Sequence, residues 1–215
     1  MVYSEEIFET LKDTVSVPRL GTYLKASGYN KARAVHFYHW NSMLCQSLYL
    51  PIQSIEVSLR NRINFALISQ YGENWWHNDQ FKAIAEERRM ANINDAKRRI
   101  KSKKHNVNTG QIVATLTLGF WVAMLDPRYN SKIWSRQLRT TFPNLPANKD
   151  RKHLHSKSKQ VANLRNRISH HEPIFKGNLM EDYSGIMQLQ MWMCPNKQAW
   201  VKSLCDFPKV SRQRP

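Results

Sequence analysis

The chain has 215 residues, enough for one well-packed core and too few for two comfortable domains, so a single domain is expected. Its 33 Lys and Arg residues against 16 Asp and Glu residues give a formal net charge of +17, which favours a polyanionic partner such as RNA, DNA or an anionic membrane surface. The three cysteines are far apart and form no CxxC pair, which argues against a disulfide framework and against a cysteine zinc site.

Two features of the sequence favour a cytoplasmic protein. The first residues, MVYSEEIFETLKD, are acidic where a secretion signal would carry a basic stretch followed by an apolar one. The longest apolar stretch, residues 113–125, is interrupted by Thr115, Thr117 and Gly119 and is shorter than the roughly 20 residues that span a bilayer. Together they predict a chain without a membrane partner.

Helical periodicity dominates the chain, and no segment shows convincing strand alternation, so an all-α fold is expected. The apolar positions of residues 31–50 predict a first helix. Pro51 then stands where a first helical turn tolerates proline, and a second helix continues in apolar steps of three to four residues until Gly72 ends it.

The middle of the chain combines a basic segment with an apolar one. Residues 81–104 are rich in Lys and Arg and predict a solvated helix that runs into a basic loop. Asn108 or Thr109 can cap the next helix, which carries the run IVATLTLGFWVAML and ends before Pro127. We expect this helix to be the most buried of the domain.

The remaining third has the same helical character. Periodicity predicts four more helices here: residues 131–142, 150–169, 179–193 and 197–204. The Glu172-Pro173 pair gives the latest end of the second of these, because a residue before proline is disfavoured in a helix. The final residues, PKVSRQRP, have the composition of a frayed basic tail. The expected organisation is one helical domain over residues 1–205 and a basic tail over residues 206–215.

The segment that carries chemistry is LRNRISHHEPIF, which begins at Leu164. On a helix, Asn166 and His170 lie one turn apart on one face, and the long side chain of Arg165 reaches toward that face. Arginine can hold the non-bridging oxygens of a phosphodiester, and histidine can move a proton to or from a ribose oxygen near neutral pH. By spacing alone, the same residues also fit a basic helix end that binds phosphate without catalysis or caps its own carbonyls.

This segment resembles the signature of the HEPN superfamily, whose RNases share an Arg, four to six residues and a His, commonly with a polar residue directly after the Arg. Three further stretches resemble the Abi-like branch of that superfamily, in which phage-abortive-infection proteins are found. They are YHWNSMLCQSLYLPIQSIEVSLRNRINFAL (residues 38–67), VATLTLGFWVAML (residues 113–125) and LQMWMCPNKQAW (residues 189–200). The resemblance spans most of the chain in the expected order.

The resemblance implies a HEPN-type helical bundle with additional helices, in a homodimer that brings two motifs together across a shared cleft. In HEPN RNases, cleavage is independent of metal ions, needs no cofactor and uses the ribose 2′-hydroxyl as nucleophile, leaving a cyclic phosphate. Carried onto this sequence, His170 is the acid/base, Arg165 the phosphate and transition-state ligand, and Asn166 the positioning residue. His171, directly after His170, is an alternative group for the proton transfer.

Other basic residues are expected to bind the RNA substrate: Arg60, Arg62, Lys101, Lys103, Lys104, Arg167 and His171. The pentapeptide LRNRI also occurs at residues 59–63, but Phe65 stands there in place of His170, so this copy cannot repeat the chemistry. Glu56, Arg60, Asn61 and Arg62 of this helix are candidates to line the RNA cleft. The structural alternative is a helix-stabilising ion pair between Glu56 and Arg60, which are four residues apart. For the lysine-rich segment, the alternative is a solvated face.

Two further groups of residues invite a functional interpretation. His153 and His155 predict no metal site, because a His-x-His pair points its side chains apart on a helix and no carboxylate-rich set accompanies it. Among the tryptophans, the Trp75-Trp76 pair is the better candidate for stacking on bases, whereas Trp121 is expected in the core.

The sequence therefore predicts a metal-independent endoribonuclease of antiphage defence or of toxin type. Because an unrestrained RNase would harm its host, a protein antitoxin or a bound regulatory RNA is expected as a partner. Two alternatives stay open: a non-catalytic RNA-binding module, and an assembly protein of a defence or toxin-antitoxin complex.

Overall fold

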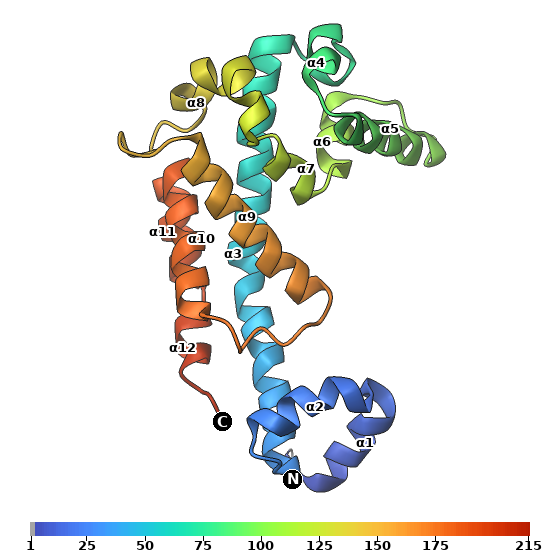
Figure 1. Ribbon diagram of the computed structural model, residues 1–215, viewed down its shortest axis with the longest axis vertical. Coiled ribbons are helices and arrows are strands. Elements are labelled where there is room, and N and C mark those ends of the chain that lie inside the picture. The colour runs from blue at the N-terminus through green and yellow to red at the C-terminus, as the bar shows by residue number, and fades with distance from the viewer. Residues whose placement is uncertain (1–2) are drawn as a thin grey trace.

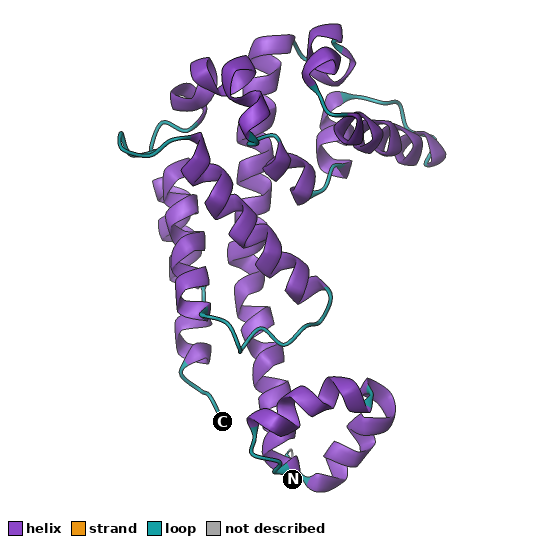
Figure 2. Cartoon of the chain, viewed as in Figure 1, coloured by secondary structure: helices purple, strands orange, loops and turns teal. Residues whose placement is uncertain are grey.

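The structure is a computed structural model that describes residues 3–215. All regular elements in this range are helices (Figure 2), which confirms the all-α expectation. The longest of them, α3 (Lys31–Tyr71), has 41 residues and forms an axis along which the other helices are arranged (Figure 1). No helix within residues 3–215 combines the length and the apolar character that crossing a membrane requires.

Helix α3 replaces the two helices that the sequence predicts on either side of Pro51. A proline in a helix has no N–H for the carbonyl four residues earlier, here that of Ser47. This carbonyl instead accepts a hydrogen bond from the thiol of Cys205, with Sγ and O 3.4 Å apart. The helix therefore passes through Pro51 because a tertiary contact supplies the missing donor. Gly72, with φ +87°, ends α3 as predicted.

Two helices before residue 31, which were not among the predicted elements, pack against one end of α3. They are α1 (Glu5–Val15) and α2 (Val17–Ala26). Ser4 caps α1 by accepting a hydrogen bond from the N–H of Ile7. Ser16 separates the two helices and has a left-handed backbone, with φ +86°.

The other end of α3 carries a group of short elements (Figure 1). In chain order they are η1 (Trp75–His77), α4 (Asp79–Ile84), α5 (Glu87–Ser102), α6 (Thr109–Thr115), α7 (Leu118–Ala123), η2 (Pro127–Tyr129), the π-helical turn η3 (Asn130–Trp134) and α8 (Ser135–Thr141). Asn108 caps α6, as predicted, but the apolar run after it forms two helices instead of one. Leu116 and Thr117 have extended backbone conformations that break it.

The C-terminal third agrees closely with the periodicity until its last residues. It contains α9 (Arg151–Ser169), α10 (Leu179–Met193), α11 (Pro195–Leu204) and α12 (Phe207–Ser211). Helix α12 lies where a frayed tail was expected. Phe207 and Val210 are buried against α3, and the indole N–H of Trp40 donates to the carbonyl of Val210 at 2.8 Å. Two apolar side chains at i and i+3 suffice to dock this one-turn helix.

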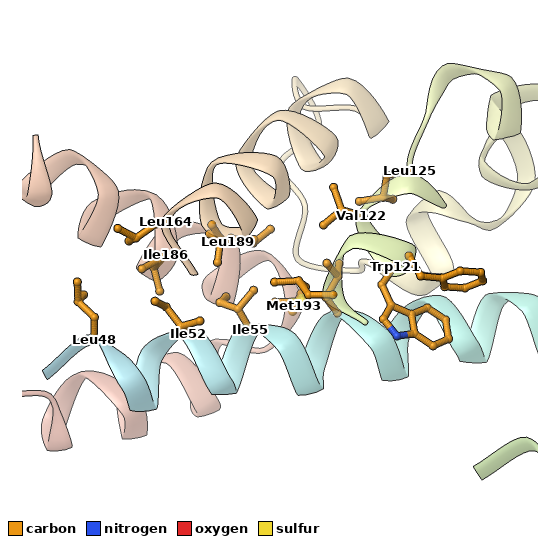
Figure 3. Close-up of a cluster of buried hydrophobic side chains, with 14 of the residues drawn as sticks. Leu48, Ile52, Ile55, Trp121, Val122, Leu125, Leu164, Ile186, Leu189 and Met193 are labelled. Atoms are coloured by element: carbon orange, nitrogen blue, oxygen red, sulfur yellow. The ribbon is translucent and has the colours of Figure 1, made fainter. Parts of the chain in front are cut away.

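The core lies between α3 and the helices that cross it. Leu48, Ile52 and Ile55 follow one another along one face of α3, and Leu164 of α9 and Ile186 of α10 lie over them (Figure 3). Farther along α3, Trp121 of α7 is fully buried, as predicted for the core. Burying side chains of this size stabilises the fold by roughly 1.5–3 kcal/mol each. The apolar face of α9 is thereby fixed on α10, α7 and α3.

Candidate functional site

The candidate site lies on α9, which a capped first turn and one apolar face hold in place. Asp150 caps its first turn, with a carboxylate oxygen that accepts from the N–H of His153 at 3.1 Å, while His153 Nδ1 accepts from the N–H of Asp150. One face of the helix is buried on α3, α7 and α10, at Leu154, Val161 and Leu164. The opposite face is exposed and carries polar residues at helical spacing: Lys159, Asn163, Asn166 and His170.

The structure brings Asn166 and His170 together at the exposed end of this face. The N–H of His170 donates to the carbonyl of Asn166 at 2.9 Å, so the two residues occupy successive turns. Both side chains are exposed. An amide and an imidazole in this arrangement can engage one phosphate group that approaches from solvent.

Arg165 points toward α3 instead. Its Nε lies 3.8 Å from Oε2 of Glu56, and the two side chains are 42% and 28% exposed. Arg165, Glu56 and Tyr49 line a cavity of about 200 Å³ between the two helices. The expected pair of Glu56 with Arg60 is not found among the described residues, because Glu56 reaches across to α9. Glu56 therefore lies at the candidate site, and its partner there is Arg165, a residue far away in the chain that local spacing does not indicate.

Helix α9 ends in a Schellman motif built on a histidine. The N–H of His171 donates to the carbonyl of Ile168 at 3.0 Å, and the N–H of Glu172 donates to that of Arg167 at 2.9 Å. His171 occupies the left-handed position of this motif, with φ +55°, where glycine is usual. A side chain there costs about 1–2 kcal/mol. Such strain is typical of residues next to functional sites.

We expect His171→Gly to raise the free energy of unfolding by about 1 kcal/mol, because glycine adopts this backbone conformation without steric cost. Chemical denaturation monitored by circular dichroism measures the change. Lys159→Gly is the matched control: on the exposed middle of α9 it is expected to lower the free energy of unfolding by about 1 kcal/mol. Equal losses in the two variants would contradict the strained-cap interpretation.

The loop after α9 is held by contacts that involve the predicted residue Arg167. Its guanidinium donates to the carbonyl of Pro173 at 2.8 Å, and its Nε lies 3.6 Å from the carboxylate of Glu172. The buried side chain of Asn41 accepts a hydrogen bond from the N–H of Ile174 at 2.8 Å. Arg167, which the sequence predicts to bind RNA, thus makes structural contacts within its own chain.

The other predicted RNA-binding residues are spread over the molecule. Arg62 donates to the carbonyl of Met193 at 2.9 Å, and the Nε of Arg60 is buried without a partner among the described residues. The predicted lysines all lie at the exposed end of α5 and in the loop after it: Lys101, Lys103 and Lys104. This end of the molecule packs around α6, away from the motif on α9 (Figure 1). The structure does not bring these lysines to Arg165, Asn166 and His170.

The tryptophan pair differs from the expectation for stacking on bases. Trp75 is fully buried, and its indole N–H donates to Asn64 at 2.8 Å, so this part of the prediction is wrong. Trp76 is half-buried, and the ammonium group of Lys97 lies 4.7 Å from its ring centroid. Gly72 turns the chain sharply after α3, and this turn directs Trp75 into the core.

The histidines before the motif make contacts with single carboxylates. His153 lies 2.6 Å from Asp150, and His155 lies 3.0 Å from Asp126. Burial is the main cause that lowers the pKa of His155, and the nearby Asp126 carboxylate partly offsets it. Within residues 3–215, no group of three or more His, Cys, Asp or Glu side chains is arranged to hold a metal ion.

Comparison with known proteins gives one match. Residues 7–176 match the model of a family described as Abi-like protein. No curated protein and no solved structure matches the chain. The matched range includes α3 and the whole of α9, and so every residue of the candidate motif.

Proposed function

The chain belongs to the Abi-like protein family, and from this membership we propose that it is a metal-independent endoribonuclease of abortive infection or of toxin type. The observation that carries the proposal is the exposed pair of Asn166 and His170, with Arg165 beside it, inside the matched range. The imidazole of His170 can supply a proton-transfer group, and the guanidinium of Arg165, five residues earlier on the same helix, can supply a phosphate ligand. The net charge of +17 supports RNA as the polyanion.

The proposed reaction is a transfer within the RNA strand. The ribose 2′-oxygen loses its proton to an imidazole and attacks the adjacent phosphorus, and the bond from phosphorus to the 5′-oxygen breaks. The leaving 5′-oxygen takes up a proton, and the products are a 2′,3′-cyclic phosphate and a 5′-hydroxyl. His170 moves the proton, Arg165 holds the non-bridging oxygens, and Asn166 orients the phosphate or the imidazole.

The contact between Arg165 and Glu56 is compatible with this role. The separation of 3.8 Å and the partial exposure of both side chains make it a weak ion pair, worth below about 1 kcal/mol. A phosphate that binds the guanidinium in a bidentate manner can displace such a partner. Glu56 then holds Arg165 at the site until RNA arrives.

We further propose a homodimer in which two copies of the motif share one cleft. Both His170 side chains of such a dimer would be available, one as base and one as acid. Exposed Asn166 and His170 at the end of α9 are compatible with a second copy that approaches this face. Sedimentation velocity with and without RNA tests the dimer, and an active protein that stays monomeric at all concentrations would contradict it.

Two other functions fit the same family and charge. A non-catalytic RNA-binding module would use Arg165 and the basic surface without turnover. An assembly protein of a defence or toxin-antitoxin complex would bind RNA no more tightly than any comparably basic surface. A protein antitoxin or a regulatory RNA is the partner that the RNase proposal calls for, since uncontrolled cleavage would damage the host.

The deciding experiment is incubation of the purified protein with total bacterial RNA in EDTA. We expect discrete fragments that end in 2′,3′-cyclic phosphates. Intact RNA after removal of any co-purified inhibitor by denaturation and refolding would overturn the proposal.

A further inference from the structure

A large cavity in the described part of the chain lies beside the motif. It has a volume of about 1040 Å³ and lies between α2, α3 and the C-terminal end of α9. Arg19 and Tyr23 of α2, Tyr38 and Tyr49 of α3, and His171 after α9 line it. Cavities of this size accommodate molecules as large as a nucleotide.

This cavity adjoins the smaller one that Arg165 lines. Tyr49, Ile168 and Ser169 line both of them. Ser169 is one helical turn after Arg165 on the same face of α9. A strand of RNA whose phosphate contacts Arg165 can therefore direct a neighbouring nucleotide into the larger cavity.

The lining combines aromatic faces with neutral polar groups. Tyr49 is 67% exposed at the boundary of the two cavities, so its ring is accessible to a planar base. Deeper in, the rings of Tyr23 and Tyr38 meet edge to face, with centroids 5.2 Å apart. Burial raises the pKa of Tyr23 to about 12 and that of Cys45 to about 11, so both groups stay neutral hydrogen-bonding groups at physiological pH.

Charge in this cavity favours an anionic ligand. Among its described lining residues there is no Asp or Glu, whereas Arg19 and His171 are present. The guanidinium of Arg19 lies 3.4 Å from the carbonyl oxygen of His171, which places it near the end of α9. Ser42 and Gln46, both exposed, add neutral donors and acceptors along α3.

Backbone strain gathers at the same place. Ser16 and His171 have φ values of +86° and +55°, and both line the cavity. Only four non-glycine residues in the described chain have positive φ, so two of the four border this one space. Non-glycine residues in left-handed conformations are typical of ligand-binding sites.

We propose that this cavity binds one nucleotide of the RNA substrate, next to the scissile phosphate, and selects its base. The inference rests on the proposed function and names the part of the substrate that the chain recognises. The base stacks on Tyr49, neutral side chains of α3 contact the base edge, and Arg19 contacts the adjoining phosphate. Cleavage is therefore selective for the base at one position beside the cut.

Binding of uncleavable RNA tests the cavity separately from catalysis. Hexamers of A, C, G or U with 2′-O-methyl groups lack the nucleophile, and fluorescence anisotropy measures their affinities. We expect the protein to bind one of them at least tenfold more tightly than another. Tyr49→Ala is expected to weaken the preferred complex by about fivefold or more, because stacking of a base on an aromatic ring is lost.

Three variants control this test. Ser42→Trp fills the cavity from α3 and is expected to abolish the preference, provided that its circular dichroism spectrum matches that of the wild type. Tyr29→Ala removes an equally exposed tyrosine, 72% accessible, outside the lining and is expected to bind all four hexamers as the wild type does. Arg165→Ala is expected to weaken all four complexes and to keep the preference.

The outcomes separate the cavity from the catalytic proposal. Equal affinities of the wild type for the four hexamers, or a preference that persists in Tyr49→Ala and Ser42→Trp, would overturn the inference even if RNA is cleaved. A preference that depends on Tyr49 would support it even if total RNA stays intact in EDTA. A free nucleoside monophosphate that binds the cavity without competing with the hexamers would make it an effector site and also overturn the inference.

Discussion

Replacing His170 by alanine is expected to lower the rate of RNA cleavage by about 10²–10⁴-fold, the usual contribution of a general acid or base. The imidazole is exposed next to Asn166, so its loss removes no buried contact. The backbone hydrogen bond from the His170 N–H to Asn166 remains in the variant. Single-turnover cleavage of a labelled RNA in EDTA measures the rate, and anisotropy with uncleavable RNA is expected to show unchanged affinity.

His77→Ala is a matched control for this variant. His77 is another exposed histidine, located at the end of η1, which follows the C-terminal end of α3, and its removal is expected to leave the rate unchanged. Cleavage at the wild-type rate by His170→Ala would exclude His170 as the proton-transfer group. His171→Gly, which keeps the fold of the cap, would then be the variant to assay.

Arg165→Ala is expected to lower kcat by about 10²–10³-fold, the typical loss when one donor to a transition-state oxyanion is removed. It is also expected to reduce the slope of log affinity against log salt concentration by about 1, since one phosphate contact disappears. Arg165→Lys restores the charge but lacks the planar pair of N–H donors, so we expect it to recover binding better than kcat.

Arg136→Ala is the control for charge alone. Arg136 is exposed on α8, away from the motif, and its loss is expected to affect affinity slightly and kcat not at all. If Arg165→Ala weakens affinity but leaves kcat intact, Arg165 contributes only to binding of the RNA and is not the transition-state ligand.

Helices α9 and α10 were predicted correctly from the regular spacing of their own apolar residues. Both occur at the predicted residues because each has one continuous apolar face. Helix α3 differs because a contact with Cys205, more than 150 residues away, satisfies the carbonyl that Pro51 leaves free. Helix α12 differs because a single turn with two buried side chains gives no repeating pattern.

The same distinction applies to the candidate site. The spacing of Asn166 and His170 predicts their common face, since both lie on one regular helix. The orientation of Arg165 depends on Glu56 from another helix, and local spacing pairs Glu56 with Arg60 instead. The large cavity beside the motif lies between three segments far apart in the chain, residues 14–23, 38–49 and 168–171, and no local pattern reveals that they pack together. Helices α1 and α2 were not among the predicted elements, although their apolar residues have helical spacing.

The packing of the other helices on the one long helix α3 has a consequence for how the protein unfolds. Helices from both ends of the sequence pack on it, and its central residues Ile55 and Leu59 are fully buried. Their amide hydrogens can exchange with solvent only when packing on both sides is lost at once, whereas amides of the exposed loop at residues 103–108 exchange through local fluctuations. The slowest-exchanging amides of α3 therefore report the free energy of global unfolding.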